Sequence, residues 1–150
     1  MSETSLHYRP MRDTDLDRVA DIEAQLHHSP WTRGNFADSL TAGHSCWVVE
    51  EEDGLCAYGV LMMGVEEAHL LNITVAIASQ RRGIGRALLG FLEGRSRDFG
   101  AQAMLLEVRP SNVEARALYR AAGFREHAVR RNYYPAAHGR EDALLMIKPL

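Results

Sequence analysis

The sequence is most constrained by a glycine-containing loop at residues 80–85, which reads Gln-Arg-Arg-Gly-Ile-Gly. Before it, residues 70–78 are apolar except at Asn72 and Thr74, a pattern that predicts a strand. After it, apolar side chains at positions 84, 87, 88, 91 and 92 have the spacing of one helix face. The first N–H groups of such a helix have no acceptor within it, and the helix dipole is positive there. The loop therefore predicts an anion-binding site.

The residues around these glycines narrow the choice of anion. The candidate binding residues are Arg81, Arg82, Gly83, Ile84, Gly85 and Arg86. A Walker A loop is excluded, because its glycines lead into Gly-Lys-Ser/Thr and this loop leads into Arg-Ala. A dinucleotide fingerprint fits in part, since Glu107 stands about where its ribose-binding acid would, but Leu88 replaces its third glycine. On this loop alone, a glycine turn with solvated arginines also stays open.

The second half of the chain predicts another strand and helix. Residues 103–108 form an apolar strand with Glu107 near its C-terminal end, where open α/β sheets place their chemistry. Ser111 and Glu114 have the spacing of a capping box that starts a helix at Asn112. Gly123 can end that helix in the left-handed conformation. Asn112 and Tyr119 are two turns apart and are expected on one helix face.

The other segments complete a single α/β domain over residues 1–150. Further strands are expected at 6–9, 46–50, 56–64, 126–134 and 142–148, with an Asp-Gly hairpin turn between the second and third of these. One helix is expected from a cap at Thr14 to Leu26, and a second at 32–40. Glu23 lies on the apolar face of the first helix.

Composition limits the class of protein. A chain of 150 residues that is 46% hydrophobic and 25% charged is an ordinary globular domain. The net charge of −3 argues against a general nucleic-acid binder. The chain begins with polar residues rather than a signal peptide and contains no apolar run of membrane length, so we expect a cytoplasmic protein. No pattern of Cys and His spacing indicates a metal.

Two sets of motifs resemble a known family. The loop at 80–85 resembles the acetyl-coenzyme A pyrophosphate loop of the GCN5-related N-acetyltransferases, Gln/Arg-x-x-Gly-x-Gly/Ala. The stretches 106–112, 117–119, 123–124, 130–135 and 139–143, with Pro30-Trp31, resemble the RimI-type ribosomal-protein-alanine N-acetyltransferases. The resemblance implies a mixed, mostly antiparallel twisted sheet that is flanked by helices and splays open between its fourth and fifth strands. It also implies acetyl-CoA as co-substrate, with no metal.

The resemblance assigns roles to individual residues. Glu107 is expected to be the general base, more basic than an exposed carboxylate if its apolar strand buries it. The alternative is a structural carboxylate paired with Arg109 or Arg125. Tyr119 is expected to protonate the leaving thiolate, and its alternative is a packed core tyrosine. A backbone N–H within Ile73, Thr74 and Val75 is expected to bind the oxyanion, and Asn112 either bonds the pantetheine or acts only locally.

The expected acceptor is a protein N-terminus. An α-amine has a pKa of about 7.7–8.0, against about 10.4 for lysine, so it needs only a mild base. Trp31, Tyr133 and Tyr134 could clamp an extended peptide, although Trp31 could equally pack in the core and adjacent strand tyrosines should face opposite sides. The resemblance implies the N-terminal alanine of small-subunit ribosomal protein eighteen. Acetylation of lysine or a small amine such as a polyamine, and a non-catalytic coenzyme A-binding sensor, stay open.

Overall fold

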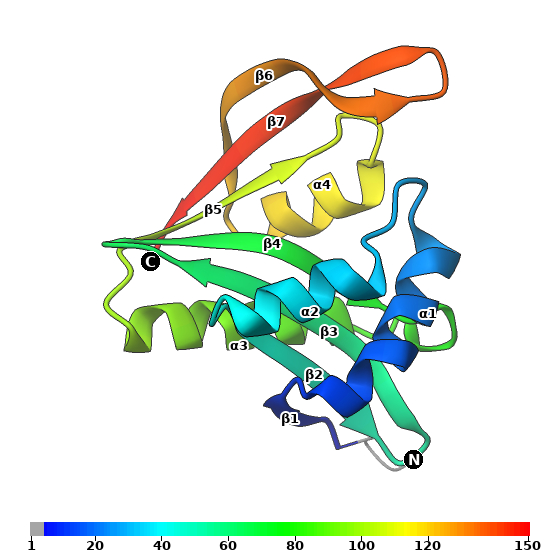
Figure 1. Cartoon of the computed structure of the whole chain (residues 1–150). Coiled ribbons are helices and arrows are strands. Elements are labelled where there is room, and N and C mark those ends of the chain that lie inside the picture. The colour runs from blue at the N-terminus through cyan, green and yellow to red at the C-terminus, as the bar shows by residue number, and fades with distance from the viewer. Residues whose placement is uncertain (1–4) are drawn as a thin grey trace. The chain divides into compact units, whose positions relative to one another are not determined.

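The computed structural model describes residues 5–150, and the polar start of the chain at 1–4 lies outside them. Figure 1 shows the elements in chain order. The strands are β1 (His7–Pro10), β2 (Ser45–Glu51), β3 (Gly54–Met63), β4 (Glu67–Val75), β5 (Ala103–Val108), β6 (Arg125–Ala136) and β7 (Gly139–Pro149). The helices are α1 (Leu16–Leu26), α2 (Arg33–Thr41), α3 (Ile84–Asp98) and α4 (Val113–Ala121), with 3-10 turns η1 (Asp13–Asp15) and η2 (Ile77–Ser79).

The chain divides into two compact units. The N-terminal unit comprises the residues up to Met62 and Asn72–Leu92, and the C-terminal unit comprises Met63–Leu71 and Glu93–Leu150. Both β4 and α3 begin in one unit and end in the other. The grouping of residues 1–150 as one domain stays a prediction.

The strands form the predicted mixed sheet. Their order is β1-β2-β3-β4-β5-β7-β6. The pairs β1–β2, β2–β3, β5–β7 and β6–β7 are antiparallel, whereas β4–β5 is parallel. The parallel pairing joins Glu67–Leu70 to residues 103–106, and β4 continues beyond it to Val75. The predicted strand at 70–78 was therefore displaced, since residues 77–79 form the turn η2.

In the N-terminal unit, the strands carry apolar side chains on both faces. One face packs against α1 and α2 in a cluster that contains Leu16, Val19, Ile22, Phe36, Cys46, Val48, Tyr58 and Val60. In Figure 1, α2 passes in front of β3. The opposite face of the sheet packs against α3. There, a Cβ atom added at Gly59 would lie 2.7 Å from Leu92 Cδ1. A larger residue on β3 at this position would collide with Leu92 unless that buried side chain shifted.

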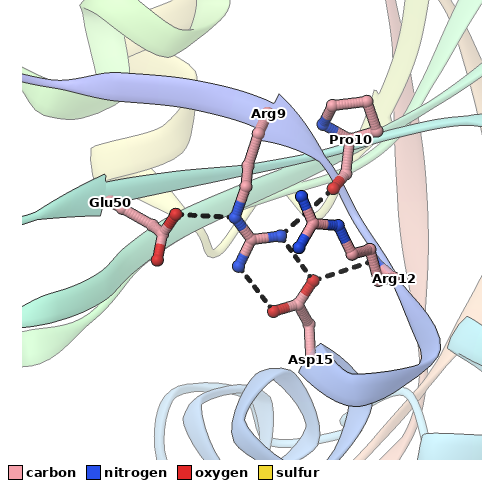
Figure 2. A network of polar contacts seen from close by, with 5 residues as sticks. All are labelled: Arg9, Pro10, Arg12, Asp15 and Glu50. Carbon is pink, nitrogen blue, oxygen red and sulfur yellow. Dashed lines mark hydrogen bonds and ion pairs between the residues drawn. The ribbon is translucent and has the colours of Figure 1, made fainter.

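An ion-pair network fixes the start of α1 (Figure 2). The Arg9 guanidinium donates to both carboxylate oxygens of Asp15 at 2.8 and 2.7 Å, and its Nε donates to Glu50 at 2.6 Å. The Arg12 N–H also donates to Asp15, at 2.8 Å. The predicted cap at Thr14 was wrong: residues 13–15 form the turn η1 around the Asp15 carboxylate, and α1 starts at Leu16.

The C-terminal unit places α4 beside strands β5, β7 and β6. Its buried apolar residues include Met104, Leu106, Val108, Tyr119, Phe124, Leu144 and Met146. The Lys148 ammonium donates at 2.6 Å to the buried carboxylate of Glu93 in the last part of α3. Strands β6 and β7 form a hairpin whose register shifts between Arg130 and Tyr134. There β6 carries three residues opposite the single residue Asp142, and the resulting bulge carries Tyr133.

Candidate functional site

The loop after β4 has the geometry of an anion site. The Gln80 side chain donates to the Val75 carbonyl at 3.0 Å, which folds the loop back onto the end of β4. The Ala87 N–H donates to the Gly83 carbonyl at 3.0 Å in the first turn of α3. The N–H groups of Ile84 and Gly85 precede that bond, so no carbonyl of the helix can accept from them. These two groups and the positive end of the helix dipole could bind a phosphate together.

Two left-handed residues give the loop its path. Arg81 has φ +62°, which is uncommon for a residue with a side chain, and Gly83 has φ +78°. A Cβ at Gly83 would meet no atom within 4 Å. The backbone conformation, rather than a lack of space, therefore requires glycine at this position.

A glutamate beside the β2–β3 hairpin turn forms an ion pair with one of the loop arginines. Glu51, at the end of β2, lies 2.8 Å from Arg82 Nη2 and accepts from Arg82 Nη1 at 3.1 Å. The Glu51 carboxylate offsets part of the charge that Arg82 brings to the loop. The loop therefore depends more on its backbone N–H groups than the count of arginines suggested.

The predicted oxyanion strand and Trp31 both belong to the N-terminal unit. Thr74 is buried, and its side chain hydrogen-bonds Asn72 and His27 rather than pointing to solvent. Trp31 packs its ring against Phe36 at 5.0 Å between centroids, while remaining partly exposed. Trp31 therefore packs partly in the core, as one of its two interpretations held, and keeps part of its surface exposed.

Glu107 is less buried than its apolar neighbours suggested. It alternates with the buried residues Met104, Leu106 and Val108 and so lies on the other face of β5, with 26% of its side chain exposed. Its nearest ion-pair partner is Arg130, at 3.8 Å and largely exposed, and not Arg109 or Arg125 as the structural alternative held. The Glu107 Oε2 atom is buried and has no hydrogen-bond partner among the described residues. One carboxylate oxygen is therefore left with free acceptor capacity.

Tyr119 projects from α4 into the interior of the C-terminal unit. Only 7% of it is exposed, and its ring lies 5.7 Å from that of Phe124. Burial raises the pKa of Tyr119 above its usual value, and the nearby Tyr134 adds to this shift. The phenol is therefore protonated at physiological pH and has a proton that it can donate.

The start of α4 differs from the prediction. Asn112, not Ser111, is the N-cap, and its side-chain oxygen accepts from the Ala115 N–H at 3.2 Å. Ser111 instead donates its N–H and its hydroxyl to Glu141 on β7, at 2.8 and 2.9 Å. The capping box with Glu114 was wrong because the Glu141 carboxylate takes the Ser111 hydroxyl. Asn112 thus has the local role that the sequence left open, and a bond to pantetheine stays a prediction.

The two adjacent tyrosines of β6 do not face opposite sides. Their ring centroids lie 4.9 Å apart in an edge-to-face contact. The bulge explains the difference, because Asn132 has φ +53° and breaks the alternation of the strand. The guanidinium of Arg109 lies 4.4 Å from the Tyr134 ring centroid, and that of Arg130 lies 4.8 Å from the Tyr133 centroid. Burial and then the charge of Glu107 raise the pKa of Tyr134 to about 12.

Several residues that had no predicted role on the acceptor side fix the backbone around these tyrosines. Arg109 donates to the Pro135 carbonyl at 2.6 Å, and Arg140 donates to the carbonyls of Asn132 and Tyr133 at 2.7 Å each. Asp142 accepts from the Asn132 N–H at 2.9 Å. Positions 109 and 139–143 lay inside the family motifs, so a signal was present, but their partners depend on a pairing that the sequence does not reveal.

Residues 5–150 contain neither a metal-binding cluster nor a helix that could span a membrane. No group of three or more His, Cys, Asp or Glu side chains in this range is placed to hold a metal ion. No helix in the same range has the length and apolar character needed to cross a membrane.

Comparisons with known proteins identify the family of the chain. Residues 14–124 match the acetyltransferase (GNAT) family. The chain is 38% identical over 140 residues to the [ribosomal protein bS18]-alanine N-acetyltransferase of Escherichia coli strain K12, covering 93% of this chain and 95% of that protein. It is 39% identical over 137 residues to the Salmonella typhimurium protein of the same name, covering 91% and 93%.

A solved structure extends the similarity to the fold. The crystal structure of the ribosomal-protein-S18-alanine N-acetyltransferase from Escherichia coli superposes with a TM-score of 0.89 at 36% identity, covering 97% of this chain and 94% of that one. The chain therefore belongs to the acetyltransferase (GNAT) family and, within it, to the RimI-type ribosomal-protein-alanine N-acetyltransferases.

Proposed function

We propose that this protein transfers the acetyl group of acetyl-CoA to the N-terminal α-amine of ribosomal protein bS18, at its alanine. The similarity to bS18-alanine acetyltransferases over nearly the whole chain supports the acceptor. The observation that carries the chemistry is the buried, unbonded oxygen of Glu107 in the same unit as the protonated phenol of Tyr119. A proton acceptor and a proton donor are the two groups that aminolysis of a thioester requires.

The N-terminal unit supplies the cofactor-binding residues. The N–H groups of Gly83, Ile84 and Gly85 bind the pyrophosphate of acetyl-CoA, and Arg81, Arg82 and Arg86 add positive charge. A backbone N–H within Ile73, Thr74 and Val75 stabilises the oxyanion that forms on the acetyl carbonyl. Asn112, in the C-terminal unit, is a further contact for the pantetheine.

The C-terminal unit supplies the groups that move protons. The substrate nitrogen attacks the acetyl carbonyl carbon, and Glu107 accepts the proton that the nitrogen loses, directly or through a water. The C–S bond then breaks, and Tyr119 donates its proton to the thiolate of coenzyme A. The products are an acetylated N-terminus and free coenzyme A. An α-amine suits a carboxylate base, because roughly a tenth or more of it is already neutral at pH 7.

The aromatic residues bind the acceptor peptide. Tyr133 is exposed on the β6 bulge and offers a flat ring. Arg140 fixes the Tyr133 backbone by donating to its carbonyl. Tyr134 is held between Tyr133 and the Arg109 guanidinium. Trp31 presents the partly exposed side of its ring from the segment before α2. We expect the protein to work in the cytoplasm on a ribosomal protein, without direct contact to nucleic acid or membrane.

A product assay tests the proposal. The full chain is incubated with acetyl-CoA and either a peptide with the N-terminal sequence of bS18 or the same peptide with a blocked N-terminus and an internal lysine. The expected product is the free peptide acetylated at its α-amine, with the blocked peptide reacting far more slowly. Acetyl groups found mainly on lysine, or on a competing polyamine, would show that the acceptor is not the α-amine of bS18. Binding of acetyl-CoA without turnover of any amine would indicate the sensor.

A further inference from the structure

A buried carboxylate that the proposed chemistry does not use lies in the N-terminal unit. Glu23, on α1, is 2% exposed, and the basic side chain recorded beside it is that of His27, whose Nε2 lies 3.5 Å from Oε1 of Glu23. Its Oε1 atom accepts from the Tyr58 hydroxyl at 2.8 Å and from the Asn72 amide at 3.1 Å, and its Oε2 atom accepts from the Trp31 N–H at 3.1 Å. Burial of a carboxylate is costly unless its oxygens are hydrogen-bonded, and these three donors meet that need.

The three donors come from different elements. Trp31 belongs to residues 27–32, which join α1 to α2 and have no regular structure (the α1–α2 segment hereafter). Tyr58 lies on β3, and Asn72 lies on β4 within the same unit. Through one carboxylate, therefore, the peptide backbone at Trp31 is tied to the strand that contains the predicted oxyanion donor.

A second connection joins the beginning of the α1–α2 segment to the same strand. The Thr74 hydroxyl donates to the side-chain amide oxygen of Asn72, Oδ1, at 2.8 Å. His27 Nε2 lies 3.0 Å from the Thr74 hydroxyl oxygen. Because the Thr74 proton is already used, the Thr74 oxygen accepts from His27, so we assign a hydrogen to His27 Nε2. The hydrogen bonds then run from His27 to Thr74, to Asn72 and to Glu23, and return through the Trp31 N–H.

The segment held in this way is open to a ligand. Residues 28–30 are exposed between the two anchored positions His27 and Trp31, and Trp31 itself is partly exposed. The anchoring uses hydrogen bonds to a charged acceptor, which are among the stronger ones in proteins. A recognition loop fixed before the acceptor arrives loses less conformational entropy on binding.

We propose that Glu23 is a positioning residue for the acceptor, which holds the α1–α2 segment and Trp31 in register with β4. The inference rests on the proposed function and adds the residue that shapes the acceptor side of the site. Glu23→Gln tests it well, because glutamine offers one acceptor oxygen and one N–H₂ group. Either the Trp31 N–H or the Asn72 amide must then face a donor.

Two control variants separate positioning from stability. Tyr58→Phe removes one buried donor but leaves the bonds from Glu23 to Trp31 and Asn72. Glu93→Gln removes the charge of another buried carboxylate, which pairs with Lys148 in the C-terminal unit. Glu93→Gln should lower the thermal midpoint without changing the KM for the peptide, whereas Tyr58→Phe should raise that KM less than Glu23→Gln does, because the bonds from Trp31 and Asn72 to the carboxylate remain.

The experiment measures steady-state kinetics with the bS18 N-terminal peptide, well below the midpoint of every variant. Glu23→Gln should raise the peptide KM by about tenfold or more, the equivalent of one lost hydrogen bond to a charged group. The Kd for acetyl-CoA should change less than about twofold, because the loop at 80–85 is not part of the network. An unchanged peptide KM in Glu23→Gln, with a normal wild-type rate, would overturn the inference and leave the proposed function standing.

A second readout does not depend on activity. In a Trp47→Phe background, Trp31 is the only tryptophan, and its fluorescence reports the α1–α2 segment. Glu23→Gln should shift that emission to the red and increase its quenching by acrylamide, whereas Glu93→Gln should not. Unchanged Trp31 fluorescence would show that the carboxylate does not hold the segment. A wild-type protein that acetylates no peptide would refute the proposed function and the acceptor role together, whatever the fluorescence shows.

Discussion

The two units each contain a glutamate with buried oxygen atoms, and the two carboxylates differ in what contacts them. Both oxygens of Glu23 accept hydrogen bonds from within the N-terminal unit. Glu107, in the C-terminal unit, has a buried Oε2 without a hydrogen-bond partner and only a distant ion pair with Arg130. A carboxylate with donors on both oxygens can hold structure in place. One with unused capacity can accept a proton from a substrate.

The largest effect should come from removing the carboxylate of Glu107, whose Oε2 has no hydrogen-bond partner. Glu107→Gln should lower kcat by about 10²–10⁴-fold, the usual contribution of a general base. The Kd for acetyl-CoA should stay near the wild-type value, because the proposed cofactor loop lies elsewhere. Stopped-flow or quenched single-turnover assays give the rate, and calorimetry gives the Kd.

Glu126→Gln is the matched control for that variant. Glu126 belongs to the same unit but is exposed and paired with Arg116 and Arg120. Its replacement should leave kcat within about twofold of wild type, as for most surface substitutions. A loss in Glu126→Gln comparable with that in Glu107→Gln would show that the total charge of the unit matters, rather than the free oxygen.

Tyr119→Phe should have the next largest effect, about 10²–10³-fold on kcat, since it deletes the proton donor and keeps the ring. The raised pKa of Tyr119 adds a pH test. An acid with a raised pKa stays protonated above the usual tyrosine value of about 10, so the wild-type rate should not fall between about pH 8 and 10 through loss of this proton. A descending limb near pH 9 that is absent in Tyr119→Phe would contradict this assignment.

A smaller effect is expected in the cofactor loop. Gly83→Val places a β-branched residue at φ +78°, so the Kd for acetyl-CoA should rise about tenfold or more while the protein stays folded. Arg82→Ala should cost less, because Glu51 already pairs with that guanidinium. Calorimetric titration compares both with Gly90→Ala, a helix position where an added Cβ meets nothing within 4 Å. Equal affinity in Gly83→Val and wild type would remove the loop from the binding site.

The smallest effect on activity should come from Asp15, another carboxylate whose oxygens are fully partnered. Asp15→Asn should lower the free energy of unfolding by about 1–3 kcal/mol and leave kcat unchanged. Arg9 lowers the pKa of Asp15 in the folded protein. This stabilisation is therefore complete above the unfolded pKa of about 3.9 and is lost as the pH falls through the lower folded value.

Urea unfolding at pH 7 and at pH 3 measures that dependence. Wild type and Asp15→Asn should differ more at pH 7 than at pH 3. A larger difference at the acidic pH would have the wrong sign for a carboxylate whose pKa is lowered by folding.

Local patterns in the sequence predicted most of the fold. The hairpin turn before Gly54, the helix expected at 32–40 and the left-handed Gly123 all follow from neighbours in the chain, and the structure confirms them, with α2 one residue later at Arg33–Thr41. The failures involve partners distant in sequence. Ser111 lost its predicted capping role to Glu141, thirty positions away, and the β6 bulge turned two adjacent tyrosines into contacting rings.

The same limit applies to the candidate site. The family motifs identified Glu107 and Tyr119, but the free oxygen of Glu107 depends on the face of β5 and on side chains from β6. Glu23 read only as part of a helix face, because its three donors come from residues 8, 35 and 49 positions further along the chain. No local pattern carries that information.

The most direct test compares the two glutamates at saturating peptide. Single-turnover rates of α-amine acetylation are measured for wild type, Glu23→Gln and Glu107→Gln, with the acetylated position checked by mass spectrometry. At saturation Glu23→Gln should reach a rate within about threefold of wild type, because excess peptide compensates for weaker binding of the acceptor. Glu107→Gln should stay at least about 100-fold slower, because excess peptide does not replace a general base. A near-wild-type rate in Glu107→Gln, or an equal loss in both variants, would contradict the division between a positioning carboxylate and a catalytic one.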